Sequence, residues 1–201
     1  SPNLSLSPDG TRLAFTGTVA GLRRLYVRRL DTFESTAIKG TETLYVHAYS
    51  PDGSAVAFIT AARAVRTVSL RDGFMSTVVT DVDYTSGLAW GSDDRITFTR
   101  NGELWQVAAK GGAAQQLTTL DHAAKEVLHG WPSVVSGGNT IFFTAVSGGE
   151  NPVSHIDRIS PATRERRRVI EGGRNPLYAA SGHLIFFRDG MVNAVPLDPT
   201  T

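Results

Sequence analysis

Short polar turns followed by short apolar runs recur along this chain at nearly even intervals. Ser7-Pro8-Asp9-Gly10 precedes Leu13-Ala14-Phe15, and Ser50-Pro51-Asp52-Gly53 precedes Val56-Ala57-Phe58. Weaker copies end their turns at residues 94, 138 and 182, so successive turns lie 43, 41, 44 and 44 residues apart. A period of about 40–45 residues is typical of the four-stranded blade of a β-propeller. The pattern therefore predicts an all-β fold of five such blades.

Each repeat divides into four expected strands. The first precedes the turn, the second is the apolar run, the third alternates apolar and polar positions, and the fourth is polar. The second strand is apolar at nearly every position, as a strand between stacked blades should be, because both of its faces are buried. Helical spacing is confined to about one turn around residues 123–128. We expect one domain with four-stranded antiparallel blades at approximately residues 1–40, 41–80, 81–120, 121–171 and 172–201.

The last repeat is shorter than the others. After Val195-Pro196-Leu197 only residues 198–201 remain, so the fifth blade is expected to lack its outer strand. We expect a monomeric ring that closes by packing of the first blade on the fifth. If five blades cannot close a ring, the exposed apolar strands would instead drive self-association.

The Ser-Pro-Asp-Gly turns have a mechanical explanation. Proline sets φ at the second turn position, aspartate accepts hydrogen bonds from nearby backbone amides, and glycine tolerates positive φ. Asp9 and Asp52 are therefore expected to be structural residues rather than catalytic acids.

Charge and composition exclude several classes of partner. Lysine and arginine number 20 against 19 acidic residues, a net charge of +1, which argues against nucleic acid or an anionic membrane surface as the main partner. No run approaches the ~18 apolar residues of a membrane helix, so direct membrane insertion is not expected. The absence of cysteine excludes disulfides and thiolate metal sites.

The repeated turn and the apolar-Ala-Phe strand resemble the TolB-type propeller repeats, which are relatives of WD-repeat propellers. A closer resemblance is to the propeller carried behind the kinase domain of bacterial eukaryotic-like serine/threonine kinases. It rests on Leu117 to Asp121, then Glu126, His129 and Trp131-Pro132, and on the closing Ala194 to Asp198. The kinase motifs themselves are absent. The resemblance implies a periplasmic or extracellular location, a role in signalling, and a propeller that usually has six blades.

Candidate chemistry is sparse. No Gly-x-Ser-x-Gly elbow occurs, which disfavours acyl transfer. The expected inner strands contain no Asp or Glu, and Asn3 with His47 would be a poor site for a hard cation. We therefore expect no catalytic residues, metal or cofactor. The alternative is a propeller enzyme, lactonase-like or associated with a hydrolase, with its site in the central channel.

Two weaker possibilities remain open. Asp81 with Asp83, and Asp93 with Asp94, could bind calcium but are better explained as parts of a solvated loop and a turn. Arginines 23, 24, 28 and 29, and arginines 164 and 166–168, form two basic groups. A soluble outer surface is the default interpretation, and an acidic partner is the sharper one.

Strand order sorts the loops onto two faces, and the longer, more variable loops gather on one of them. Function tends to lie on loops held by a rigid scaffold, so this face, around the channel mouth, is predicted to bind a protein or small-molecule ligand without catalysis. The longest such loop is expected at residues 120–130. The candidate binding residues are His47, Tyr84, His122, Lys125, Glu126, His129, Trp131 and Asn151.

Overall fold

The computed structural model describes residues 4–150 and 152–200, and these residues form strands, turns and loops without a helix. No helix that could cross a membrane is therefore present in the described ranges. The candidate Asn151, like Asn3, lies outside the described residues.

Five antiparallel sheets follow one another along the chain, four with four strands and the last with three, which confirms the predicted fold class. The first contains β1 (Leu4–Leu6), β2 (Arg12–Val19), β3 (Leu22–Arg29) and β4 (Ser35–Ile38). The second contains β5 (Leu44–Tyr49), β6 (Ala55–Thr60), β7 (Ala64–Ser69) and β8 (Met75–Thr80). The third contains β9 (Leu88–Trp90), β10 (Arg95–Arg100), β11 (Glu103–Ala108) and β12 (Gln115–Gln116).

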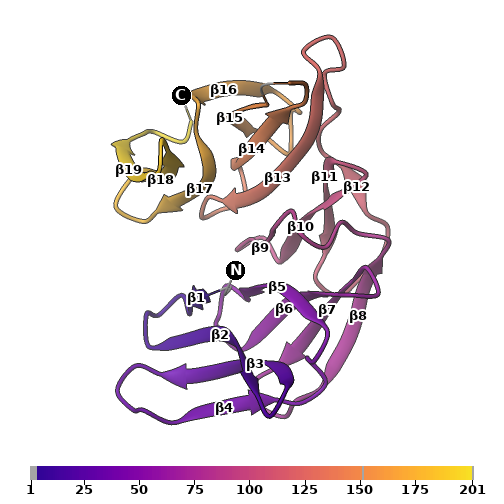
Figure 1. The fold of residues 1–201 in the computed structure, drawn as a ribbon, viewed down its shortest axis with the longest axis vertical. Helices are drawn as coiled ribbons and strands as arrows, with labels where there is room; N and C mark the ends of the chain where they lie inside the picture. The colour runs from indigo at the N-terminus through magenta and orange to yellow at the C-terminus, as the bar shows by residue number, and fades with distance from the viewer. Residues whose placement is uncertain (1–3, 151, 201) are drawn as a thin grey trace.

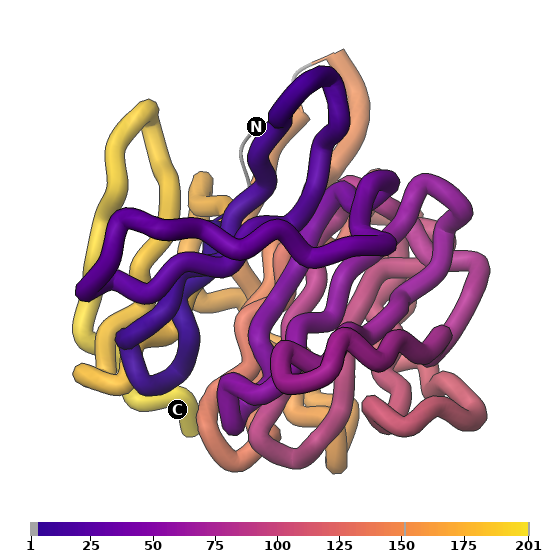
Figure 2. The backbone as a smooth tube through the Cα atoms, turned by 90° about the horizontal axis from the view of Figure 1, so that it is seen from below, coloured from indigo at the N-terminus to yellow at the C-terminus, as the bar shows by residue number. Residues whose placement is uncertain are grey.

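The fourth sheet contains β13 (Glu126–Val134), β14 (Ile141–Ser147), β15 (Val153–Ile159) and β16 (Arg166–Glu171). The fifth contains β17 (Arg174–Ala179), β18 (His183–Arg188) and β19 (Met191–Pro196). Figure 1 shows the sheets arranged around a common centre, with β1, β5, β9, β13 and β17 innermost. In Figure 2 the β2–β3 hairpin and the β14–β15 loop rise on the same face of the molecule.

Two predicted segments differ from the structure. The long loop expected over residues 120–130 ends early, because β13 begins at Glu126, and the expected helical turn around 123–128 is absent. The polar fourth strand expected in the third blade is reduced to the two residues of β12, because Leu117 leaves the strand and packs into the core beside Leu104.

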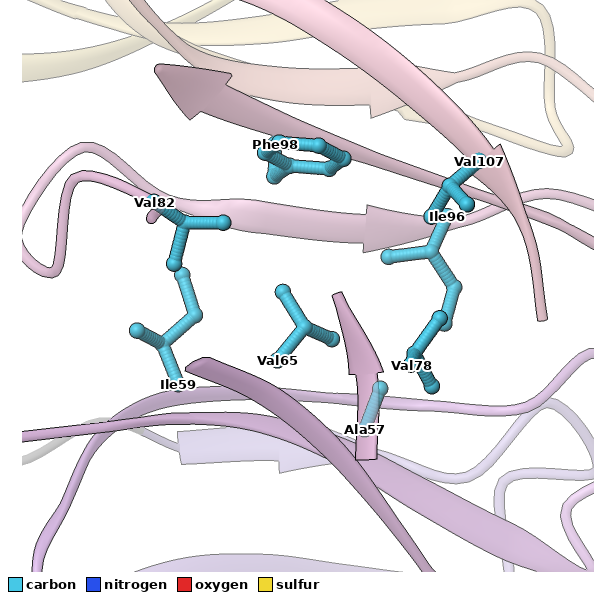
Figure 3. Packing of buried hydrophobic residues seen from close by; sticks show 8 residues of the cluster. All are labelled: Ala57, Ile59, Val65, Val78, Val82, Ile96, Phe98 and Val107. Atoms are coloured by element: carbon cyan, nitrogen blue, oxygen red, sulfur yellow. The ribbon is translucent and has the colours of Figure 1, made fainter. Parts of the chain in front are cut away.

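Successive sheets are held together by apolar side chains from both faces of their central strands. On β14, Phe142 and Phe143 are both fully buried, yet Phe142 packs toward the fifth sheet and Phe143 toward the third. Figure 3 shows the equivalent layer between the second and third sheets, where Ile59 and Phe98 lie in one cluster. Adjacent residues of a strand point to opposite faces. A continuous apolar run therefore lets one strand pack against the preceding sheet on one face and the following sheet on the other.

The ring is open between the first and fifth sheets. Four hydrophobic clusters join the five sheets in sequence order, and none among the described residues joins the fifth to the first. The predicted closure by side-chain packing of the first blade on the fifth is therefore wrong. The large apolar side chains left exposed on these two sheets are Leu4, Leu6, Val19, Leu22, Leu177, Phe187, Met191 and Val192.

The accessible surface agrees with an open ring. The chain exposes 10554 Å². A closed monomer of this mass would expose about 9,200 Å², so the excess is about 1,400 Å². Since the fifth sheet also lacks an outer strand, one edge of β19 has no hydrogen-bonded neighbour among the described strands.

The two Ser-Pro-Asp-Gly turns are confirmed as structural. In the second, the Ser50 hydroxyl donates to Asp52 Oδ1 at 2.6 Å, the Ser54 amide donates to the same oxygen at 3.0 Å, and the Ser54 hydroxyl donates to Oδ2 at 2.7 Å. The Ser50 oxygen in turn accepts the amide of Ala55 at 2.9 Å. The serine hydroxyl, followed by the turn amide and hydroxyl, lowers the pKa of Asp52 to about 2. Asp9 makes the same set of bonds in the first turn.

Candidate functional site

A cavity of about 670 Å³ opens at the mouth of the central channel. Four of its lining residues, Tyr45, Leu88, Trp131 and Asn175, stand 43 or 44 residues apart, which is the repeat period. All four lie on the inner strands of successive blades, and the approximate rotational symmetry of the fold brings them together. Tyr45, Trp131 and Asn175 fall at register shifts of their strands, whereas Leu88 pairs with Phe98, as His47 does with Phe58 in the second blade. The other residues that line the cavity include Leu4, Arg23, His47 and Tyr84.

β-Bulges shape this mouth. The pairing of the inner strand shifts between Leu44 and His47 on β5, between Gly130 and Ser133 on β13, and between Arg174 and Leu177 on β17. A bulge leaves its extra residues unpaired and redirects their side chains. Tyr45, Trp131 and Asn175 lie within these shifts of register, and all three line the cavity.

Two of these bulged residues have left-handed backbone conformations. Trp131 has φ 50° and Asn175 has φ 53°, and each precedes a proline. Asparagine tolerates this region, whereas for a bulky side chain it is an outlier, with a cost on the order of 1–3 kcal/mol. The Trp131 amide donates to the Ser86 carbonyl at 2.5 Å, which ties the strained residue to the neighbouring blade.

Aromatic rings and a neutral histidine contribute to the cavity wall. Tyr45 and Tyr84 have ring centroids 4.8 Å apart at an interplanar angle of 46°, and their side chains are partly exposed. His47 lies deeper, and its Nε2 donates to the Ala14 carbonyl at 3.2 Å, while Nδ1 is buried without a hydrogen-bond partner. Burial lowers the pKa of His47 despite the Ala14 carbonyl, so it is uncharged at neutral pH.

The structure distributes the predicted binding residues over three places. His47, Tyr84 and Trp131 line the cavity at the channel mouth. His122 and Lys125 are exposed on the crossing from the third to the fourth sheet and are absent from the cavity lining. Glu126 and His129 are buried within β13, at 4% and 0% exposure, so the expectation of an accessible binding loop is wrong for these two.

Glu126 and His129 belong to a buried polar network in the fourth blade. Arg166 of β16 pairs with both oxygens of Glu126 and, through Nε at 2.5 Å, with Asp157 of β15. His129 Nε2 donates to Glu126 Oε2 at 2.9 Å, and its Nδ1 accepts the hydroxyl of Thr118 at 2.8 Å. The network therefore joins the end of the third blade to the fourth.

Electrostatics in this network favour ionised carboxylates. Burial raises the pKa of Glu126, but hydrogen bonds from Arg166, the Asp121 amide and His129 outweigh it and lower the pKa to about 2. For Asp157 burial is likewise outweighed, by His155 and Arg166, and its pKa is lowered. Burial and the charge of Arg166 lower the pKa of His129, which is therefore neutral.

Glu126, His155 and Asp157 place three potential metal ligands within 4.8 Å of one another. The arginines fit this site better than a divalent cation does. Arg166 donates hydrogen bonds to the carboxylates of Glu126 and Asp157, and Arg168 lies 2.9 Å from His155 Nε2. The two arginine charges therefore already balance the charges of Glu126 and Asp157. We therefore interpret this group as a structural ion network. Arg166 is thus half-buried and departs from the default interpretation of its group as outer surface, whereas Arg167 and Arg168 are exposed.

The proposed calcium candidates have protein partners instead. Asp83 accepts the Gly102 amide at 2.9 Å and pairs with Arg63 at 3.2 Å. Asp81 also faces Arg63, at 3.6 Å. Asp93 and Asp94 accept hydrogen bonds from the Arg95 amide and the Trp90 indole. Each aspartate thus serves a loop or turn.

The sequence reasoning missed Tyr45, Asn175 and Arg23 at the channel mouth. The signal for Asn175 was present, because Asn175 shares the phase of Trp131 within the repeat and, like Trp131, precedes a proline. It also missed the network of Asp157 and Arg166. The one local feature of the sequence that points to this network is the alternation His155-Ile156-Asp157, because it places two ionisable side chains on the same face of a strand.

Comparisons with known structures support the fold. TolB from Acinetobacter baumannii has a TM-score of 0.71 at 14% identity, over 96% of this chain and 53% of TolB. The Swd1 (Cps50) β-propeller domain of Myceliophteria thermophila has a TM-score of 0.73 at 15% identity, over 100% of this chain and 69% of that one. A puromycin-hydrolysing peptidase of Mycobacterium tuberculosis has a TM-score of 0.68 at 17% identity, over 98% and 35%.

The chain is thus a β-propeller structurally similar to TolB and to WD40-like propellers. It spans about half the length of that TolB chain. No family model matches the sequence, and a search of the curated proteins finds no match. Because these structural neighbours include both binding modules and enzymes, the fold alone does not select a function.

Proposed function

We propose that this chain is a non-enzymatic binding module whose ligand occupies the channel mouth. The observation that carries the proposal is the convergence of inner-strand residues from successive blades on one cavity of about 670 Å³. Ligand pockets commonly have volumes of about 300–1,000 Å³, apolar and aromatic walls and a few polar groups.

The cavity wall supports binding rather than catalysis. Its described polar side chains are Arg23, His47, Thr85, Asn175 and the hydroxyls of Tyr45 and Tyr84, with no Asp, Glu, Ser or Cys among them. His47 is hydrogen-bonded to the Ala14 carbonyl rather than to Thr85. General acid–base or nucleophilic chemistry needs a titratable group or nucleophile positioned against a base. The carboxylates of the fourth blade lie in a different place and are engaged by arginine.

Strain at Trp131 is a further argument. A bulky residue is held in an unfavourable backbone conformation at the cavity wall, and such strain tends to persist at sites of function. A purely architectural propeller would gain stability by relaxing this bulge.

Ligand-observed NMR with a fragment library would test the proposal. Fragments that bind the wild-type chain should lose roughly tenfold or more in affinity in Tyr45→Ala or Tyr84→Ala. Phe74→Ala is the matched control, because Phe74 is an exposed aromatic residue on the β7–β8 connection and does not line the cavity. If both tyrosine variants bind all hits as the wild type does, the channel mouth is not the site.

The resemblance to kinase-associated propellers supports a finer proposal, that the module acts as an extracytoplasmic sensor or protein-interaction platform. Fractionation of the source cells with an antibody against this propeller would test it. Recovery in the cytoplasmic fraction would contradict this location and leave the binding site itself unaffected.

A further inference from the structure

The channel mouth has a single charged side chain among its described lining residues. Arg23 of β3 is half-buried, reaches the cavity wall and forms no ion pair with a described residue. Its neighbour Arg24, in contrast, pairs with Glu42 at 2.8 Å. With no carboxylate in the described lining and His47 neutral, Arg23 gives the mouth a net positive potential.

Aromatic side chains line the same cavity as Arg23. Tyr45 and Tyr84 form a tilted pair, and Trp131 lies on the fourth-blade side of the same cavity. Such rings supply large, rigid contact area to a flat apolar group. The Asn175 side chain, exposed on the fifth-blade side, adds an amide that can donate and accept.

We propose that the channel mouth binds a carboxylate attached close to an aromatic ring. The planar guanidinium of Arg23 would hold the carboxylate in bidentate fashion, and the tyrosines with Trp131 would contact the ring. One unpaired arginine matches one negative charge, whereas a phosphate group is usually held by several donors or cations. This inference rests on the proposed function, because it names the ligand class of the same cavity.

Two sources carry this chemistry, a free aromatic acid and the C-terminus of a peptide that ends in an aromatic residue. The probes are therefore phenylacetate with phenylacetamide, and N-acetyl-Ala-Phe with its C-terminal amide. Each acid differs from its amide in charge and in having a second acceptor oxygen where the amide has an NH2 donor. Titrations on the whole chain would be followed by ligand-observed NMR at low and high salt.

At low salt at least one acid should bind about tenfold more tightly than its amide, and the preference should shrink at high salt. Arg23→Gln should abolish the preference while the amide still binds. Arg24→Gln removes the same charge from the adjacent, paired arginine and should keep the preference. Thermal unfolding of both variants would show that each remains folded.

Equal binding of acid and amide, or a preference that survives in Arg23→Gln, overturns the inference. The inference is also overturned if neither acid binds at about 10 mM, a concentration on the order of the largest dissociation constants that can be measured. The proposed function is tested separately by the library hits, because uncharged fragments lost in Tyr84→Ala would support the site even if no acid binds. The acid that binds more tightly identifies the source.

Discussion

Replacing Arg166 by methionine tests the buried network of the fourth blade. The substitution retains much of the aliphatic volume but removes the guanidinium that pairs with Glu126 and Asp157. These carboxylates have exposed fractions of 4% and 3%, so neither can exchange its lost partner for bulk water without local opening.

The expected cost is large. Removing one partner of a buried ion pair leaves an uncompensated charge and destabilises by about 3–5 kcal/mol. His129 still donates to Glu126, and His155 lies 3.4 Å from Asp157, so we expect a value near the lower end, about 3 kcal/mol. This is a substantial part of the 5–15 kcal/mol by which domains are typically stable.

Arg167→Met is the matched control on the same strand. Arg167 pairs only with Glu165, and both side chains are more than half exposed, so its loss should cost about 0–1 kcal/mol. Urea unfolding monitored by tryptophan fluorescence would give both free energies of unfolding. The triple variant Glu126→Gln, Asp157→Asn, Arg166→Met should recover part of the loss, because it buries no unpaired charge.

Equal destabilisation by Arg166→Met and Arg167→Met, within about 0.5 kcal/mol, would refute the reasoning. It would mean that the carboxylates are solvated or that Arg166 spends most of its time in water.

Three further predictions follow from the structure. Lowering the pH from about 4.5 toward 2 should destabilise the wild type, because Glu126 has a folded pKa of about 2, below its ordinary value of 4.5, and the stability from a lowered carboxyl pKa is lost as the pH falls toward the folded value. The difference in unfolding free energy between the wild type and Arg166→Met should shrink over this range. A constant difference would contradict the ion pair between Arg166 and Glu126. Asp52→Ala should lower the free energy of unfolding in urea by about 1 kcal/mol, because the turn loses the hydrogen bonds of this carboxylate, and should leave binding at the channel mouth unchanged. A loss of binding without a loss of stability would show that the turn is not merely structural. Light scattering at micromolar concentration should give a mass above 21.6 kDa, because the open faces of the first and fifth sheets expose Leu6 and Val192. Val192→Lys should reduce this self-association. A monomeric mass for both the wild type and Val192→Lys would show that these faces remain in water.

The fold class was predictable from the sequence because its signals are local. A turn such as Ser50 to Gly53 specifies its own geometry through hydrogen bonds within five residues. The apolar run Val56 to Ile59 indicates a strand buried on both faces, and this can be predicted without knowing which strands it packs against. Repetition of these two signals at a blade-like period is enough to predict propeller blades.

The candidate site was predictable only in part. His47, Tyr84 and Trp131, which were among the predicted binding residues, do line the cavity; His47 and Trp131 lie on inner strands and Tyr84 on a crossing between blades. Arg23 was overlooked because alternation along a strand does not show whether a side chain will find an acidic partner. Glu126 and His129 were misplaced because their burial depends on Arg166, which is 40 residues away from Glu126 in the sequence.

The sequence by itself determined the number of blades, the antiparallel strand order and the chemistry of the turns, since each depends on interactions between near neighbours in the chain. Only the tertiary structure decided which polar residues become buried, how the bulges at Tyr45, Trp131 and Asn175 direct side chains to one cavity, and whether the ring closes. These outcomes depend on contacts between blades, which join residues far apart in the sequence. Four hydrophobic clusters join successive sheets, and none among the described residues joins the fifth sheet to the first.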